Sequence, residues 1–539
     1  MMMNSKLPRE LRSKVVNELV DHNDPPFNPR HNSGDIYGWR YQQYHRNPDF
    51  LSLREVSRDW NETLEADAHL WTNIQISSDR DLVVAKSAIQ RSAHRPLSIF
   101  IGMKHGVSVY VDEPWIEDTI QFIATCIHRC VRLTLHLHWQ KIAMALQYWS
   151  NIPAPCLRLL YLRDSLDKED AISGGYRDLN IRGSTIKRLP NLFAGYMPLL
   201  EVVALDYVNI NWDPMPFVTP KVSNFTLWLP EGTTGLNGRQ FQKILMGLPE
   251  VAKLVVRAKG PEFTLNELFN LPKLDYIELR DFRSFYLSPQ LNMRYPRITT
   301  LVLNGPIHIN GSPDGLLDLL SVLPNLRTLE LSMSNFSADP NFHLPPLQRR
   351  GALEQLTCLS ITSSNFIPFR ILAAFSFPSL RQTFIKYKTS RREAIFIDPS
   401  LSEIFGSMDL LPALTILQIH VPSDARDVVK LLHLAPNLKT LETMGLANYR
   451  DLFQILAHNG GSKKMGVLCP NLRRFRSTLA MADREYPNWY QALVMARNDL
   501  FARGICAPLK VTTLKKRKYG SGELFQSDVE SDSENRHYY

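Results

Sequence analysis

The chain has 539 residues, of which 44% are apolar and 21% are charged, and its formal net charge is +9. This composition excludes a largely disordered chain, and the length exceeds what one ordinary hydrophobic core serves, so we expect several domains or one elongated array. A positive excess suits an acidic partner or nucleic acid, but this one is small for the length and does not by itself indicate nucleic acid.

The cysteines and the amino terminus indicate the compartment. The chain has six cysteines, mostly far apart, with no visible disulfide framework. Its start, MMMNSKLPRE, lacks the apolar core of a signal peptide, and no apolar run is long enough to cross a bilayer. We therefore expect free thiols, no membrane partner, and a cytoplasmic or nuclear location.

Two amphipathic segments predict a small helical block at residues 1–76. In the first, over residues 7–20, Leu7, Leu11, Val15 and Leu19 fall on one helical face. The second is expected to begin at a cap near Asp49. Its apolar face would contain the following residues: Phe50, Leu53, Val56, Trp60 and Leu64. Residues 22–48 between the two segments have a loop composition and are treated as an insertion.

A cysteine and histidine cluster follows at residues 126–138. Cys126, His128 and Cys130 read C-x-H-x-C, and His136 and His138 come soon after. A zinc site needs ligands that converge tetrahedrally. The segment VRLTLHLHW instead alternates aliphatic and polar residues like a strand, with both later histidines on the polar face. We therefore interpret the cluster as strand packing and expect no metal and no cofactor.

A phrase of the form P-x-L-x-x-L-x-L recurs over most of the remaining chain. Clear copies read PKLDYIEL from Pro272, PRITTLVL from Pro296 and PNLRTLEL from Pro324. The last two aliphatic positions are two residues apart, so their side chains share one face of a strand. Recurrence of one short strand per unit is typical of a stacked solenoid, in which these aliphatic side chains form continuous columns.

The prolines predict where helices end. Apolar helical segments precede several of them, such as GLLDLLSVL before Pro324 and DVVKLLHLA before Pro436. Proline has no amide hydrogen and cannot continue a helix. Each unit is therefore expected to run helix, proline, strand and loop, which predicts an α/β fold. We assign the solenoid to residues 77–506.

The residue after the last strand aliphatic should point away from the core, on the same side in every unit. This outward row contains the following residues: Arg163, Arg182, Asp206, Trp228, Arg257, Arg280, Asn304, Ser332, Thr362 and Lys386. Its first half is rich in arginine, which pairs well with carboxylate or phosphate. We hypothesise that an acidic or phosphorylated segment binds near Arg257 and Arg280. Arg163, Arg182 and Trp228 are further candidate contacts, and a solvated face without a ligand is the alternative.

The carboxyl-terminal segment, residues 507–539, is polar and charge-segregated. A basic run, Lys515 to Lys518, is followed by an acidic stretch, a composition that cannot bury a core and predicts disorder. The basic run is either a nuclear import signal or a solvated tail.

These motifs resemble two families. LPREL at residues 7–11, LREVSRDWNETL at 53–64 and HLW at 69–71 together resemble an F-box, and the repeats resemble leucine-rich repeats. F-box proteins of mushroom-forming fungi are similar in having such an insertion. The resemblance implies a small all-α F-box bundle followed by an irregular, curved leucine-rich-repeat solenoid. By motif position it implies that Leu7, Pro8, Leu11, Val56 and Trp60 contact a Skp-type adaptor.

The resemblance also implies a function. An F-box protein of this kind is the substrate-recognition subunit of an SCF-type (Skp-cullin-F-box) ubiquitin ligase, with repeats that hold a protein substrate. It would itself be no enzyme, and no nucleophile, metalloprotease or phosphate-loop motif occurs in the sequence. The alternative is a repeat scaffold that binds protein or nucleic acid without any ubiquitin link.

Overall fold

The structure is a computed structural model, and the residues it describes leave several gaps. The described positions are 8, 11, 14, 57–102, 114–164, 192–208, 219, 221–229, 238–258, 262–264, 268, 271–282, 284–287, 295, 297–305, 307–309, 315–333, 351–363, 367–387, 408–421, 425–444, 449–457, 467–478 and 486–514. The predictions for Leu7, Val56, Arg182 and the insertion at 22–48 lie outside these residues.

The chain forms two compact units, each with an α/β fold. Unit 1 comprises Met1–Val251 with Ser533–Tyr539, and unit 2 comprises Ala252–Asp532. Among the described residues, the main sheet contains 16 strands, each of which belongs to one of the two units. Every strand pair described within a unit is parallel. This confirms the α/β class with long parallel pairing.

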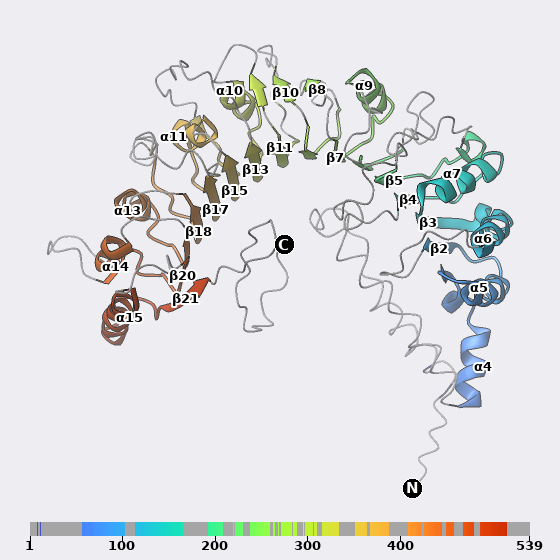
Figure 1. The fold of residues 1–539 in the computed structure, drawn as a ribbon, viewed down its shortest axis with the longest axis horizontal. Coiled ribbons are helices and arrows are strands. Elements are labelled where there is room, and N and C mark those ends of the chain that lie inside the picture. Colours follow the sequence, from blue (N-terminus) through green and yellow to red (C-terminus); the bar gives the residue numbers. More distant parts are fainter. Residues whose placement is uncertain are drawn as a thin grey trace, which may run out of the picture. The chain divides into compact units, whose positions relative to one another are not determined.

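In unit 1 the strands pair in chain order from β1 to β6. The strands are β1 (Asn73–Ile76), β2 (Leu97–Gly102), β3 (Cys130–Leu137), β4 (Leu159–Asp164), β5 (Val202–Asp206) and β6 (Asn224–Trp228). The helices are α4 (Arg58–Ala66), α5 (Asp79–Arg91), α6 (Pro114–Ala124), α7 (Trp139–Tyr148) and α9 (Gly238–Met246), with the 3-10 turns η1 (Ala68–Trp71), η2 (Ile127–Arg129) and η4 (Leu192–Gly195). Figure 1 shows α5, α6 and α7 on the same side of β2 to β4.

In unit 2 the main strands also follow chain order. They are β7 (Lys253–Arg257), β9 (Tyr276–Arg280), β11 (Thr300–Asn304), β13 (Thr328–Met333), β15 (Cys358–Ser363), β17 (Gln382–Tyr387), β18 (Ile416–His420), β19 (Thr440–Met444), β20 (Arg474–Thr478) and β21 (Lys510–Leu514). Within this unit the strands follow an arc in Figure 1, which is compatible with the expected curved solenoid.

The helices of unit 2 lie on one side of its main strands (Figure 1). They are α10 (Gly315–Ser321), α11 (Ile371–Ala374), α13 (Ala425–Leu434), α14 (Tyr449–Ala457) and α15 (Tyr486–Ala502), with the 3-10 turn η6 (Ile367–Arg370). Two small parallel sheets accompany them. One contains β8 (Glu262–Thr264), β10 (Ser284–Leu287) and β12 (Ile307–Ile309), and the other contains β14 (Gly351–Ala352) and β16 (Phe375–Ser376).

The predicted aliphatic columns form the core of unit 2. Ile277 pairs in register with Leu301, which pairs with Leu329, and each is at most 1% exposed. The second column behaves in the same way, since Leu279 and Leu303 are fully buried register partners. Burying each such side chain stabilises the fold by about 1.5–3 kcal/mol.

The predicted helix ends are also confirmed. Helix α10 ends at Ser321, before Pro324, and α13 ends at Leu434, before Pro436. Each proline is followed by a turn that leads into the next strand, β13 or β19. The proline therefore separates the helix from the strand in each of these units, as its missing amide hydrogen predicts.

The weaker copies of the repeat differ from the clear ones because polar residues occupy core positions. Thr383 replaces an aliphatic residue between its register partners Leu359 and Leu417. Thr443 and Ser477 are register partners in the other column, and both are fully buried. The hydroxyls of Thr383 and Thr443 have no hydrogen-bond partner in the part of the chain that the structure describes. Such a buried hydroxyl costs about 1–3 kcal/mol.

The helix predicted from Asp49 through Leu64 is wrong at Ser57. Helix α4 begins at Arg58, and Ser57 is extended, with φ −163° and ψ 163°, and caps it by accepting a hydrogen bond from the Trp60 amide. Serine is a strong helix cap because its hydroxyl satisfies one of the free amides of the first turn. The expected F-box bundle is not shown, because most of residues 1–56 lie outside the described positions.

Strand pairing bears on two predicted boundaries. Strand β1 lies at the end of the range assigned to the helical block, where Ile74 and Ile76 alternate like the start of a strand, and it pairs with β2 in the sheet of unit 1. Strand β21 lies beyond residue 506, where the solenoid was expected to end, and pairs with β20 over Lys510 to Leu514. The predicted disordered tail therefore cannot begin before residue 515.

In the ranges that the structure describes, no helix combines the length and the apolar character that crossing a membrane requires.

Candidate functional site

The strand register aligns the outward row within each unit, as the sequence predicts. In unit 1, Arg163 pairs with Asp206, which pairs with Trp228. Unit 2 has its own row without a register shift, and its register partners in order are Arg257, Arg280, Asn304, Ser332, Thr362, Lys386 and His420. The predicted contacts of each unit therefore do share one face of its strands.

A second row on the same face was missed by the sequence analysis. It lies two residues before the outward row on each strand, so its side chains point in the same direction. In unit 2 it contains three carboxylates, Glu278 on β9, Glu330 on β13 and Glu442 on β19. The x positions of the repeat phrase contain these glutamates, and a comparison of those positions could have found them.

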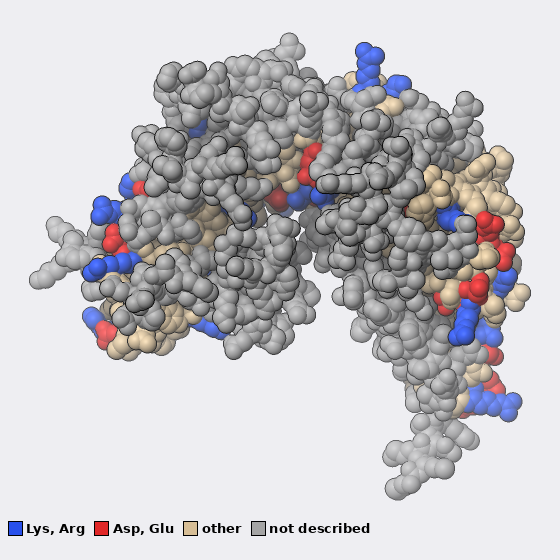
Figure 2. Space-filling view, viewed as in Figure 1, with Lys and Arg blue, Asp and Glu red and all other residues tan. Residues whose placement is uncertain are grey.

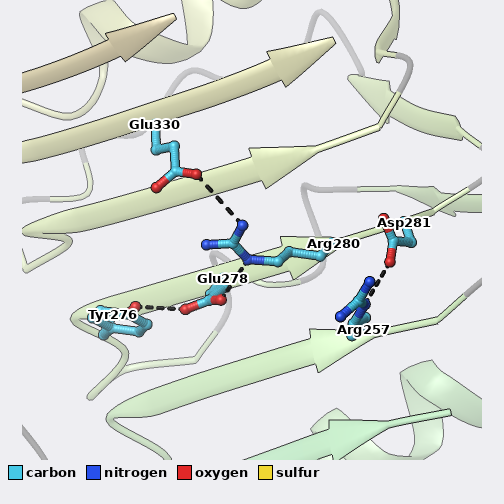
Figure 3. Close-up of polar contacts among 6 residues, drawn as sticks. All are labelled: Arg257, Tyr276, Glu278, Arg280, Asp281 and Glu330. Carbon is cyan, nitrogen blue, oxygen red and sulfur yellow. Dashed lines mark hydrogen bonds and ion pairs between the residues drawn. The ribbon is translucent and has the colours of Figure 1, made fainter. Parts of the chain in front are cut away.

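The carboxylates of this second row neutralise the predicted arginine site (Figure 3). Arg280 Nε lies 2.6 Å from Glu278 Oε1, and its Nη1 lies 3.5 Å from Glu330 Oε1. Tyr276 donates its hydroxyl to Glu278 Oε2 at 2.6 Å. Arg280 is thus held between two neighbouring carboxylates, and one of these, Glu278, also accepts from a tyrosine.

Arg257 is paired as well. Its Nε lies 2.5 Å from Asp281 Oδ2 (Figure 3). Asp281 follows the end of β9 and has a φ of 61°, in the left-handed region that few non-glycine residues adopt. Aspartate is among the residues that tolerate this region best, and the turn directs its carboxylate to the neighbouring strand's arginine.

Burial and charge act against each other in this cluster. Burial raises the pKa of Glu330, while Arg280 lowers it and Glu278 raises it further. Burial disfavours the charged form of Arg280, but the Glu278 and Glu330 carboxylates outweigh burial and raise the pKa of the guanidinium. An incoming anion would have to displace these carboxylates, so the cluster is a poor anion site.

In the outward row of unit 1, the charge of an arginine is likewise balanced by a carboxylate of the same chain. Arg163 Nε lies 3.6 Å from Asp206 Oδ2, and the Tyr161 hydroxyl donates to the same oxygen at 3.0 Å. Asp206 is buried at 3% exposure. Trp228, its register partner, is half-buried. Arg163 and Trp228 therefore lie on one face but offer no uncompensated charge, and their role in binding stays a prediction.

A further polar cluster on β18 to β20 was not predicted. Glu442 accepts from Gln418 Nε2 at 3.2 Å and lies 3.0 Å from His420 Nε2 and 3.8 Å from Arg476 Nη1. The ring of Phe384 packs edge-on against His420. Burial raises the pKa of Glu442, but the hydrogen bond and charge of His420, with Gln418 and Arg476, lower it below its usual range.

The cysteine and histidine segment contributes buried side chains to the core of unit 1. Cys126 and Cys130 are buried, and burial raises the pKa of Cys126 to about 11 and that of Cys130 further still. Within the described ranges, no group of three metal-ligating side chains converges. His136 pairs in register with Arg163 and so lies on the polar face of β3, as expected, although it is only 7% exposed. His138 follows β3 and caps α7.

The predicted adaptor contacts are placed only in part. Pro8 is exposed, and Leu11 is helical and 48% exposed. Trp60 lies on the first turn of α4 and is half-buried, whereas Leu64 on the same helix is fully buried. Leu11 and Trp60 therefore retain apolar surface that a partner could cover, and their role also stays a prediction.

Comparison with models of known protein families and with curated proteins finds no match for this chain.

Proposed function

We propose that this chain is a substrate-recognition subunit of an SCF-type ubiquitin ligase, in which the repeats bind a protein substrate and the amino-terminal block binds a Skp-type adaptor. The observation that carries the recognition role is the unbroken register of parallel strands in unit 2, from β7 to β21. Such stacked strands present an extended, rigid face, which is the usual binding surface of repeat proteins.

The link to ubiquitin transfer is supported by the F-box-like motifs at residues 7–11 and 53–71. A block this small cannot cover all its apolar side chains, so a partner that buries Leu11 and Trp60 is physically reasonable. The receptor needs no acid, base or metal, because tethering a substrate near the transferring enzyme raises its effective concentration.

Capture of the adaptor and cullin from a cell extract tests the proposal. The test variant carries Leu7→Ser, Pro8→Ser and Leu11→Ser in the full chain. The control is Val83→Ser on α5, which removes an apolar side chain that is 69% exposed outside the motif. We expect the wild type and the control to co-purify with a Skp-type adaptor, and the triple variant to lose it.

Equal adaptor capture by the wild type and the triple variant would contradict the assigned interface. Absence of any adaptor with the wild type would contradict the ubiquitin link and leave a repeat scaffold as the better description. Circular dichroism of the triple variant, unchanged from the wild type, shows that the loss comes from the contact and not from unfolding.

A further inference from the structure

A continuous column of residues borders the sheet of unit 2 where its strands begin. Each member occupies the position directly before a strand, and its amide donates to the carbonyl of the preceding member. These bonds are 2.8–2.9 Å long and connect the residues in the order Ala252, Asp275, Thr299, Arg327, Thr357, Arg381, Thr415, Lys439 and Arg473. The column therefore runs at right angles to the strands, along consecutive repeats.

Cations dominate this column, and the residues beside it, from Arg327 onward. We define the basic edge as Arg327, Arg381, Lys439, Arg473, Arg474 and Lys510, where Arg474 and Lys510 are register partners on β20 and β21. All six side chains are exposed. Among the described residues, none of the six takes part in an ion pair.

The basic edge thus differs from the outward row, whose Arg257 and Arg280 are each bound to carboxylates of the same chain. It also differs from the side of unit 2 that carries the helices. There Arg426 pairs with Asp451, and Lys430 pairs with Asp427. Figure 2 shows blue and red atoms next to one another over α13 and α14. Exposed cations without an ion pair therefore line one border of the sheet in the part of unit 2 that the structure describes.

The spacing of these cations suits an extended chain. Neighbouring strands lie about 4.8 Å apart, so Arg327, Arg381 and Lys439, which are two strands apart from one another, repeat at about 10 Å. A polypeptide in the extended polyproline II conformation has three residues per turn and rises about 3.1 Å per residue, so every third side chain lies on one face and recurs at about 9 Å, close to the spacing of the cations. The intervening Thr357 and Thr415 are small and leave room for it.

We propose that the basic edge binds an extended protein segment that carries several anionic side chains, and that this segment belongs to the substrate. The identification as substrate rests on the proposed function; the binding of an anionic segment does not. Carboxylates and phosphoserines share the required chemistry, because both pair with guanidinium and ammonium groups.

Nucleic acid fits the basic edge less well. Proteins that bind single strands place aromatic side chains between the cations so that bases stack on them. The interleaved residues here are Thr357 and Thr415, and the adjacent strand positions from β13 to β19 carry Thr328, Cys358, Gln382, Ile416 and Thr440. None of these provides a stacking surface.

The column itself supplies the substitution for the test. Thr357 and Thr415 donate their hydroxyls to the carbonyls of Arg327 and Arg381, at 3.1 Å and 3.0 Å. Threonine therefore fits this position, and the edge variant is the full chain with Arg381→Thr, Lys439→Thr and Arg473→Thr. The control variant removes the same charge from the helical side, with Arg426→Gln, Lys430→Gln and Arg503→Gln.

The probes are labelled 12-residue peptides with glutamate or phosphoserine at every third position. A glutamine peptide and a single-stranded 12-nucleotide DNA serve as comparison probes. Fluorescence anisotropy should show binding of at least one anionic peptide, weakened about tenfold or more in the edge variant and within about twofold in the control. Added salt should weaken the binding, since the contacts are exposed.

Three results would overturn the inference. One is equal peptide binding by the wild type and the edge variant. Another is tighter edge-dependent binding of the DNA than of either peptide. The third is tighter peptide binding by a chain with Asp528→Asn, Glu530→Gln, Asp532→Asn and Glu534→Gln, since the chain's own carboxyl-terminal segment would then be the occupant.

The adaptor test separates this inference from the proposed function. Peptide binding that depends on the basic edge, in a chain that captures no adaptor, would retain the anionic-segment site and reject the ubiquitin link. Adaptor capture by an edge variant that has lost the peptide shows that the two sites act independently, which supports the inference.

Discussion

Two regions of unit 2 place arginines on the same sheet in opposite electrostatic states. On β7 and β9, Arg257 and Arg280 are half-buried and bound to Asp281, Glu278 and Glu330. At the basic edge, Arg381, Lys439 and the cations beside them are exposed and have no ion-pair partner among the described residues.

The difference follows from position in the repeat. A side chain in the middle of a parallel sheet face lies between neighbours about 4.8 Å away on both sides, so it loses water and requires a counter-charge. A side chain directly before the strand projects at the border of the sheet and keeps its water, so it requires none. Residue type alone therefore does not identify a cation that is available to a ligand.

The largest expected loss of stability comes from removing the carboxylate of Glu278, whose side chain is 5% exposed and pairs with Arg280. Replacing it in Glu278→Gln leaves Arg280 without its 2.6 Å counter-charge. We expect the free energy of unfolding to fall by about 1–3 kcal/mol, measured by urea denaturation at pH 7.

Glu330→Gln is the matched control for this change, because the Glu330 side chain is 36% exposed and lies 3.5 Å from the same arginine. Its loss should stay below about 1 kcal/mol. Equal losses for the two variants would show that burial does not decide the strength of this pairing.

A smaller, pH-dependent effect is expected at Glu442. The pKa of Glu442 is lower in the folded chain than in the unfolded chain. Its pairing with His420 and Gln418 therefore stabilises the fold fully above the unfolded pKa of about 4.3. This stabilisation is lost as the pH falls through the lower pKa of the folded state. Glu442→Gln should therefore destabilise the chain at pH 7 and have a smaller effect at pH 3. Denaturation curves of both proteins at the two pH values measure this, and a difference that grows on acidification would refute the assignment.

The smallest effect is expected at the basic edge. Arg327→Thr removes an exposed cation without an ion-pair partner and puts threonine where the column already accepts it, so the free energy of unfolding should change by less than about 0.5 kcal/mol. A loss as large as that of Glu278→Gln would mean that Arg327 has a structural partner, and it would remove the contrast between the two regions.

Much of the fold could be predicted because its signal is local and repeated. The triplet Leu274, Ile277 and Leu279 recurs with constant offsets, and the structure buries these positions and aligns them in register. The break at Ser57 was missed because the apolar period continues across it, so only the capping hydroxyl marked the helix start. The strand β21 was missed because KVTTL, at residues 510–514, departs from the repeat phrase.

For the candidate site, the sequence predicted only which residues align on one face of the strands. The outward row is a consequence of strand periodicity, so the sequence by itself determined which residues share a face. Pairing between strands decided their charge state, because Arg280 meets Glu330 across strands that are 50 positions apart in the sequence. The basic edge likewise exists only because cations from separate repeats are brought into one column by backbone hydrogen bonds. Short-range patterning is encoded locally, whereas electrostatic compensation depends on distances that only the stacked repeats establish.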